Sequence, residues 1–247
     1  MRLKGQLVEA ADLTDDQRDR MFALMEAHYE NVCRRRFEAD LAEKRWVIQV
    51  LDPDTGELLG FSTQMLLSVV AGGRPVEALF SGDTIIDRAH WGDAVLPHVW
   101  GRLVLALLGA RPRAEFYWFL ISKGYKTYRY LPLFFREFYP RHDAPMPPRA
   151  REVLDALARH KFAAAYDAGA GLVRGDGGKD RLRPGIADVT AERLRDTHVR
   201  FFVERNPGHA NGDELCCLAP LSRANFTPAA YRVIGPEPVP ATAGAFG

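Results

Sequence analysis

The sequence has little cysteine, almost no net charge and no long apolar run. Its only cysteines are Cys33 and the adjacent pair Cys216 and Cys217, which excludes a disulfide framework and gives none of the usual zinc-site spacings. With 33 basic and 32 acidic side chains the net charge is +1, which argues against nucleic acid or a membrane surface as partner. Because no segment offers about 18 uncharged apolar residues, we expect no signal peptide and no membrane span, and we expect a cytoplasmic protein without a metal site.

Apolar residues make up 47% of the chain, and their spacing predicts a mixed set of strands and helices. The expected strands cover residues 3–10, 46–51, 58–70, 76–87, 116–121 and 214–221. The expected helices cover residues 14–29, 35–44, 94–108, 125–139, 149–166 and 190–204. Pro132 is expected to kink the helix over 125–139 or to divide it into two turns, and residues 169–185 are expected to form a loop.

The order of these elements over residues 3–140 is strand, helix, helix, three-strand meander, helix, strand, helix, and it resembles the GNAT superfamily of acyl-CoA-dependent N-acyltransferases. The resemblance implies an α/β (α+β) fold with a mixed, mostly antiparallel central sheet flanked by helices. It divides the chain into a GNAT-like core over 1–145 and a helical section over 146–235 that contributes the last strands. We expect the tail, residues 236–247, to be disordered.

A phosphate-binding turn is expected in the stretch SGDTIIDRAHWGDA, where the fourth strand passes into the next helix. In the resembled family this turn reads Arg/Gln-x-x-Gly-x-Gly/Ala, and its backbone N–H groups hold the cofactor pyrophosphate at a helix N-terminus. Gly92, Asp93 and Ala94 match the last three positions. Ala89 stands where arginine or glutamine is usual, with Arg88 one place away.

Two interpretations of this turn remain open, because Trp91 is bulkier than usual and Asp93 adds a carboxylate beside the proposed phosphates. In the first, the turn is a modified cofactor cradle, and acyl-CoA or an acyl carrier protein thioester is held by Arg88, Trp91, Gly92, Asp93, Ala94 and Lys123. In the second, Asp93 caps the helix and Trp91 plugs the core.

The resemblance also implies a carboxylate that deprotonates the acceptor amine and a tyrosine that protonates the departing thiolate. We assign the first role to Asp83, because Gly82 beside it predicts a bulge that re-aims a side chain toward a site. Strand alternation puts Asp83 on the same face as Leu79 and Ser81.

Four tyrosines in or near the last helix are candidates for the acid: Tyr125, Tyr128, Tyr130 and Tyr139. We assign the role to Tyr128, because it lies in the first turns of that helix. His28 and Tyr29, at the end of the first helix, and Trp118, in the aromatic fifth strand, are expected to contact the acceptor substrate.

The sequence therefore predicts an acyltransferase that moves an acyl group from a CoA or carrier-protein thioester to the amine of a small molecule. The alternative is a non-catalytic binding module of the same fold that has lost the use of acyl-CoA. An acyl carrier protein is a possible partner, whereas nucleic acid and membrane are not expected.

Overall fold

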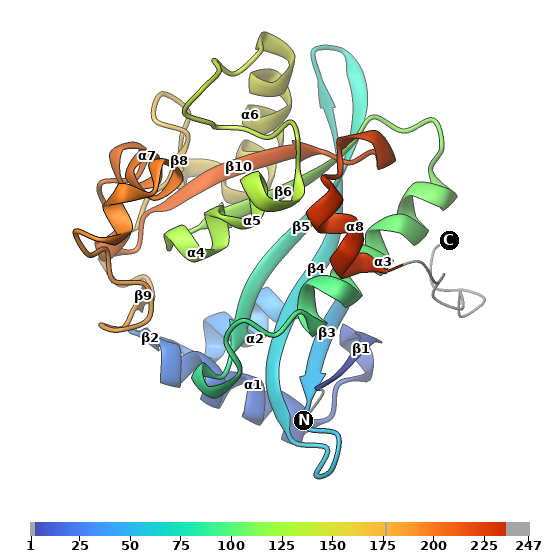
Figure 1. Ribbon diagram of the computed structural model, residues 1–247, viewed down its shortest axis with the longest axis vertical. Coiled ribbons are helices and arrows are strands. Elements are labelled where there is room, and N and C mark those ends of the chain that lie inside the picture. Colours follow the sequence, from blue (N-terminus) through green and yellow to red (C-terminus); the bar gives the residue numbers. More distant parts are fainter. Residues whose placement is uncertain (1–2, 176, 236–247) are drawn as a thin grey trace.

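The computed structural model describes residues 3–175 and 177–235 (Figure 1). Its strands are β1 (Lys4–Glu9), β2 (Tyr29–Glu30), β3 (Trp46–Leu51), β4 (Leu58–Ala71), β5 (Arg74–Ile86), β6 (Phe116–Ser122), β7 (Tyr166–Asp167), β8 (Leu172–Val173), β9 (Arg181–Leu182) and β10 (Glu214–Pro220). Its α-helices are α1 (Asp15–His28), α2 (Arg34–Ala42), α3 (Val95–Ala110), α4 (Tyr125–Tyr128), α5 (Tyr130–Phe134), α6 (Pro148–Phe162), α7 (Thr197–Arg205) and α8 (Pro228–Ile234). The fourth strand expected from the sequence is therefore β5.

One sheet runs through the described chain in the order β1-β3-β4-β5-β6-β10-β8-β7. Neighbouring strands are antiparallel, apart from the central pair β5 and β6, which is parallel. A separate two-stranded pairing joins β2 to β9. The expected mixed, mostly antiparallel sheet flanked by helices is confirmed.

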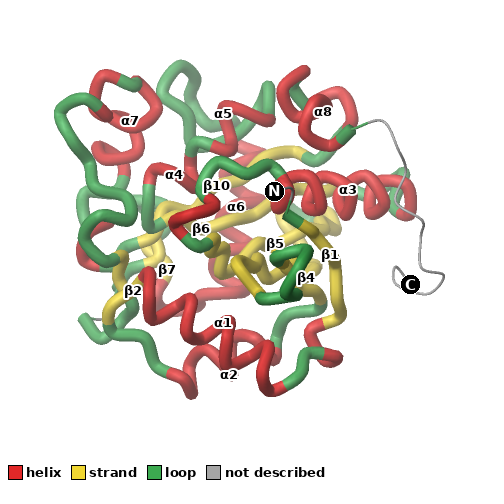
Figure 2. Tube along the Cα trace, turned by 60° about the horizontal axis from the view of Figure 1, so that its bottom comes forward, coloured by secondary structure: helices red, strands yellow, loops and turns green. Residues whose placement is uncertain are grey.

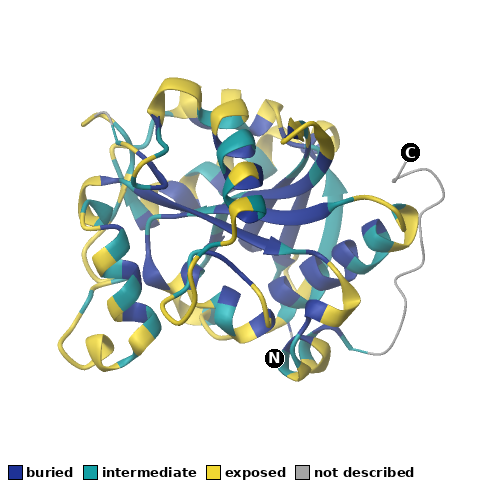
Figure 3. Ribbon diagram, turned by 90° about the horizontal axis from the view of Figure 1, so that it is seen from above, coloured by how far each residue is buried: buried dark blue, intermediate teal, exposed yellow. Residues whose placement is uncertain are grey.

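The helices cover both faces of the sheet (Figure 2). On one face α3 and α8 pack over a core that includes Leu79 and Trp118. On the other, α1, α2 and α6 cover two further clusters, one around Phe61 and one around Phe80. Figure 3 shows the buried residues gathered on the strands and on the inner sides of the helices. No helix in the described ranges is long and apolar enough to cross a bilayer.

Two helix predictions are wrong in extent. The helix expected over 125–139 is split at Arg129 into α4 and α5 and ends at Phe134, after which Phe135 and Tyr139 form isolated β-bridges with Phe226 and Leu218. The helix expected from residue 190 begins only after Asp196. There the Asp196 carboxylate caps the helix by accepting the His198 N–H at 2.9 Å. The expected loop over 169–185 contains β8 and β9, and the expected tail, 236–247, lies outside the described residues.

The bulge expected at Gly82 is present. Ser81 pairs with Gln64 and Thr84 pairs with Ser62, so Gly82 and Asp83 together oppose one residue of β4. The extra residue reverses the alternation. Leu79 belongs to the core under α3, whereas Ile85 belongs to the core under α1. The prediction that Asp83 shares the face of Leu79 is therefore wrong, because Asp83 is the second residue of the bulge and follows the parity of Ile85.

The parallel pair β5–β6 comes apart just beyond the bulge. Pairing runs from Glu77 with Phe116 to Ser81 with Leu120 and then stops, although β5 continues to Ile86. The second half of β5 therefore has an unpaired edge on the side of β6.

Candidate active site

A cavity of about 650 Å³ lies where β5 and β6 part. Its walls come from the end of α1, from α2, from β5 beyond the bulge, from residues 91–93, and from residues 123–130 around α4. The segment 179–187, which contains β9, closes another side, and we call it the strap. The strap is held against the end of α1 by the β2–β9 pairing and by a 2.8 Å ion pair between Arg181 and Glu30 (Figure 1).

Asp83 is the acidic centre of this cavity. Burial, followed by repulsion from Asp40, raises the pKa of the Asp83 carboxyl to about 7, against the attraction of Lys123 and Lys44. No described residue forms a hydrogen bond or an ion pair with its carboxylate. Asp40, by contrast, is bound by Lys44 at 2.6 Å and by Lys161 at 3.5 Å. Asp83 is thus a carboxylate that can take up a proton near neutral pH.

The corner between β5 and α3 is open to ligands. Gly92 has φ of 95° and exposes its backbone, and a Cβ there would meet no atom within 4 Å. The Asp93 side chain accepts the Val95 N–H at 2.7 Å and so caps α3. The exposed N–H groups of Gly92 and Ala94 have no acceptor in the part of the chain that the structure describes. Unpaired N–H groups at the start of a helix are suited to an anion.

Trp91 does not plug the core, so that part of the second interpretation is wrong. Its side chain is 42% exposed and lines the cavity. The indole Nε1–H donates to the Ile86 carbonyl at 2.9 Å, and the Lys126 Nζ lies 3.5 Å from the ring centroid. Trp91 therefore flanks the corner without sealing it.

The strand order, the single parallel pair and the open corner at the end of that pair give the architecture that the resemblance to the GNAT superfamily implies, a mixed and mostly antiparallel sheet flanked by helices.

Comparison of this chain with known proteins gives only distant likenesses. A scan against protein-family models and a search of curated proteins each found no match. Among solved structures, a probable N-acyltransferase from Enterococcus faecalis aligns at 15% identity over 55% of this chain, with a TM-score of 0.41, so that this chain spans 33% of that protein. A GNAT family N-acetyltransferase from Escherichia coli, solved with CoA, aligns at 12% identity over 53% of this chain and 68% of its own, with a TM-score of 0.39. A protein from Mycobacterium tuberculosis, also solved with CoA, aligns at 14% identity over 89% of this chain and 99% of its own, with a TM-score of 0.41.

Lys123 lines the cavity, but its ammonium already forms ion pairs with carboxylates of this chain. Its ammonium forms ion pairs with Asp180 and, at 3.5 Å, with Glu214. Both partners come from the C-terminal part of the chain, so no local sequence pattern predicts the pairing. The expectation that Lys123 is available for cofactor phosphates is contradicted by this pairing. Arg88 is exposed just outside the cavity wall.

Tyr128, the assigned acid, does not reach the cavity. It is fully buried against α7, and its hydroxyl donates to the Pro140 carbonyl at 2.9 Å. The helix break at Arg129 changes which tyrosine faces the site, and Tyr130 lines the cavity instead. Burial raises the pKa of Tyr130, which keeps its proton available for donation.

Of the expected acceptor contacts, His28 and Tyr29 line the cavity and Trp118 does not. The His28 Nδ1–H donates to the Leu24 carbonyl at 2.9 Å, and its buried Nε2 has no partner among the described residues. Trp118 lies on the α3 face, 4.6 Å from the Trp100 ring, and donates its Nε1–H to Ser81. The expected contact between Trp118 and substrate is therefore wrong, since Trp118 is a core residue.

Sequence reasoning missed the strap altogether. Asp180, Leu182 and Ile186 line the cavity from it, yet the two residues of β9 are too few to show a strand period. Within residues 3–175 and 177–235 there is no cluster of three His, Cys, Asp or Glu side chains suited to a metal ion.

Proposed function

We propose that this protein is an acyltransferase that moves an acyl group from a CoA thioester to the amine of a small molecule. The observation that carries the proposal is Asp83. It is a carboxylate without a partner among the described residues, its pKa is raised to about 7, and it lines a cavity at the open end of a parallel strand pair.

The corner after β5 fits the phosphates of the donor. The Gly92 and Ala94 N–H groups stand at the positive end of the α3 dipole, and Gly92 leaves room for close approach. The Asp93 carboxylate is occupied by its hydrogen bond to Val95, so it is directed at the helix rather than at the phosphates.

The unpaired edge of β5 fits the extended arm that links those phosphates to the thioester. Asp87 donates its N–H to Leu59 on β4 at 2.8 Å. Alternation along the strand then turns the peptide groups of Thr84 and Ile86 toward the gap. The Ile86 carbonyl accepts the Trp91 indole, which leaves the Thr84 peptide groups and the Ile86 N–H for the ligand.

In this mechanism Asp83 takes a proton from the incoming ammonium, which converts the acceptor into a nucleophile. A carboxyl with a pKa of about 7 is partly ionised at neutral pH, so it can accept a proton, and it holds that proton more tightly than an ordinary aspartate does. The amine then attacks the thioester carbonyl carbon, the C–N bond forms and the C–S bond breaks. Tyr130 gives its proton to the departing thiolate and regains one from the nitrogen of the new amide. Tyr29, whose pKa is also raised by burial, is the second candidate for that step.

His28 is proposed to position the acceptor. With Nδ1–H bound to Leu24, the neutral imidazole presents a bare Nε2 that accepts one hydrogen bond from a substrate N–H. The acceptor is therefore expected to keep an N–H group besides the one that reacts.

Acyl transfer is tested by incubating the protein with a panel of acyl-CoA donors and amines and measuring the release of free thiol. Thiol release that depends on both substrates, and that falls in Asp83→Asn, supports the proposal. Binding of CoA without any turnover would instead favour a non-catalytic module. Turnover with an acyl carrier protein thioester but not with an acyl-CoA would show that the donor is the carrier protein rather than CoA.

A further inference from the structure

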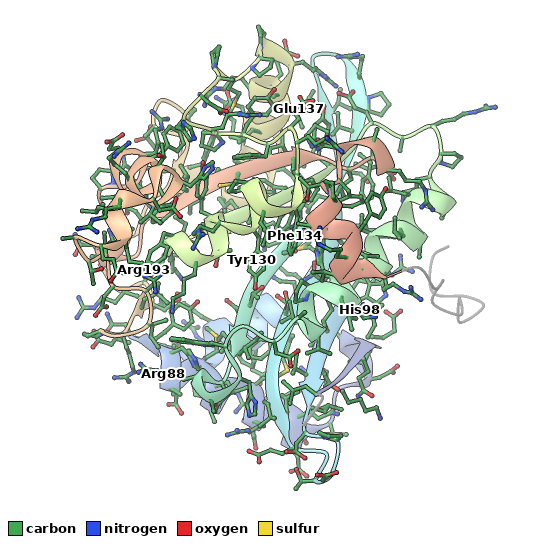
Figure 4. The ribbon with its side chains drawn as sticks, viewed as in Figure 1. Arg88, His98, Tyr130, Phe134, Glu137 and Arg193 are labelled. Carbon is green, nitrogen blue, oxygen red and sulfur yellow. The ribbon has the colours of Figure 1, made fainter. Side chains whose placement is uncertain are left out.

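Two cations, Lys126 and Arg88, lie against Trp91 at the wall of the cavity that Asp83 lines, and Arg193 acts on Lys126 from a neighbouring segment. Lys126 Nζ lies 3.5 Å from the Trp91 ring centroid, and the Arg88 guanidinium carbon lies 5.9 Å from it. Arg193, from the segment before α7, is close enough to act on the charge of Lys126. Figure 4 labels Arg88 and Arg193 at the left of the view, with Tyr130 nearer its centre.

These cations have no acidic partner to balance them. None of the three has a carboxylate within 4.0 Å among the residues that the structure describes. Burial and the repulsion of Arg193 and Arg88 lower the pKa of Lys126, and only Asp188 opposes them. Like charges held together without a counter-charge are unfavourable, so the arrangement suits an anion that is absent from the protein itself.

The cluster is held in place next to the open corner. The Trp91 indole is fixed by its hydrogen bond to Ile86, and Lys126 packs on its face. On the strap side, the Arg88 Nη1 lies 3.5 Å from the point where a Cβ on Gly185 would stand. The N–H groups of Gly92 and Ala94 are the proposed donors to the pyrophosphate, and the side-chain cations are a second, separate set of donors.

We propose that Arg88, Lys126 and Arg193 form a subsite for a phosphate monoester, the third phosphate that distinguishes coenzyme A from dephospho-coenzyme A. This inference rests on the proposed function. The Arg88 guanidinium can donate two hydrogen bonds to one phosphate, and Lys126 and Arg193 supply further positive charge. The Trp91 ring holds the side chains of Arg88 and Lys126 in place by cation–π contact.

The test is calorimetric titration of the full chain with coenzyme A and with dephospho-coenzyme A. The wild type is expected to bind coenzyme A at least about tenfold more tightly, the ratio that one charge-assisted hydrogen bond supplies. Arg88→Gln, Lys126→Gln and Arg193→Gln should each lower that ratio about threefold or more, with the affinity for dephospho-coenzyme A nearly unchanged. All three residues are exposed, so the variants are expected to fold.

Arg129→Gln is the matched control, because Arg129 is an exposed cation in the same region that already pairs with Asp196 at 3.2 Å. It should keep the wild-type ratio. Equal affinity of the wild type for the two ligands would overturn the subsite and leave the proposed function intact. Failure of both ligands to bind would overturn both. Loss of transfer from a carrier-protein thioester in Lys126→Gln, with an unchanged ligand ratio, would assign the cluster to protein docking and also overturn the proposal.

Discussion

Asp83 owes its chemistry to position rather than to a motif. The bulge turns it away from Leu79, and burial beside Asp40 raises its pKa to about 7. Asp83→Asn is expected to lower kcat/KM about 10²-fold to 10⁴-fold, the usual range for loss of a general base. In the wild type kcat/KM should rise through an inflection near pH 7. This rise of kcat/KM with pH should be absent from the residual activity of Asp83→Asn. An unchanged rise in the variant would show that another group is the base.

The raised pKa of Asp83 also predicts a pH-dependent stability. The folded protein holds this proton up to about pH 7, whereas the unfolded chain releases it near the ordinary aspartate pKa of 3.8. Stability contributed by the neutral carboxyl is therefore lost as the pH rises through that window. Asp83→Asn should match the wild-type melting temperature near pH 4 and exceed it increasingly up to pH 7 to 8. A variant less stable than the wild type at pH 8 would show that the buried charge is compensated.

Substitution of Tyr130 should affect activity, whereas substitution of Tyr128 should affect stability. Tyr130→Phe is expected to lower kcat about 10-fold to 100-fold through loss of the proton donor. Tyr128→Phe should leave kcat unchanged and cost about 1 kcal/mol of unfolding free energy, because the Pro140 carbonyl loses its hydrogen bond. Steady-state kinetics and urea unfolding on both variants check this. Loss of activity in Tyr128→Phe alone would restore the assignment made from the sequence, and Tyr29→Phe tests the remaining candidate.

At the scale of single elements, the bulge in β5 depends on glycine at position 82. A Cβ there would lie 2.6 Å from Thr63 Oγ1 and 2.9 Å from Lys44 Cε, and both side chains are buried. Gly82→Ala is therefore expected to cost about 1–3 kcal/mol. Gly109→Ala, in α3 where a Cβ meets nothing within 4 Å, should instead stabilise by about 0.5–1 kcal/mol. Chemical unfolding of Gly82→Ala and Gly109→Ala measures these free energies. Equal changes in the two variants would show that the space around residue 82 does not require glycine.

The sequence predicted the strands and the bulge better than the directions of side chains. Strand β3 matches its prediction at both ends, because β-formers fill it and turn residues follow it. The face of Asp83 was missed because a one-residue bulge inverts every later position. The choice of Tyr128 over Tyr130 failed because the helix breaks at Arg129 without a proline or glycine there. The pairing of Lys123 with Glu214 depends on tertiary contact, which no local pattern encodes.

For the whole molecule, the sheet crosses the boundary at residue 145 that the sequence suggests. β10 pairs with β6 from Leu215 with Ser122 to Pro220 with Tyr117, and α6 covers the core around Phe80. We therefore expect one cooperative unfolding transition for the full chain. A chain of residues 1–145 should lack a stable fold, since β6 would become an exposed edge. Calorimetry of the full chain checks this, and two separate transitions would support independent domains.

Backbone amides at the corner after β5 are proposed to hold the phosphates of an acyl donor beside Asp83. Hydrogen–deuterium exchange of the full chain with and without coenzyme A measures whether these amides bind a ligand. We predict slower exchange in the segment from Thr84 to Leu96, which contains the exposed N–H groups of Gly92 and Ala94, and little change in α6. Saturating coenzyme A that leaves exchange in this segment unchanged would contradict the account.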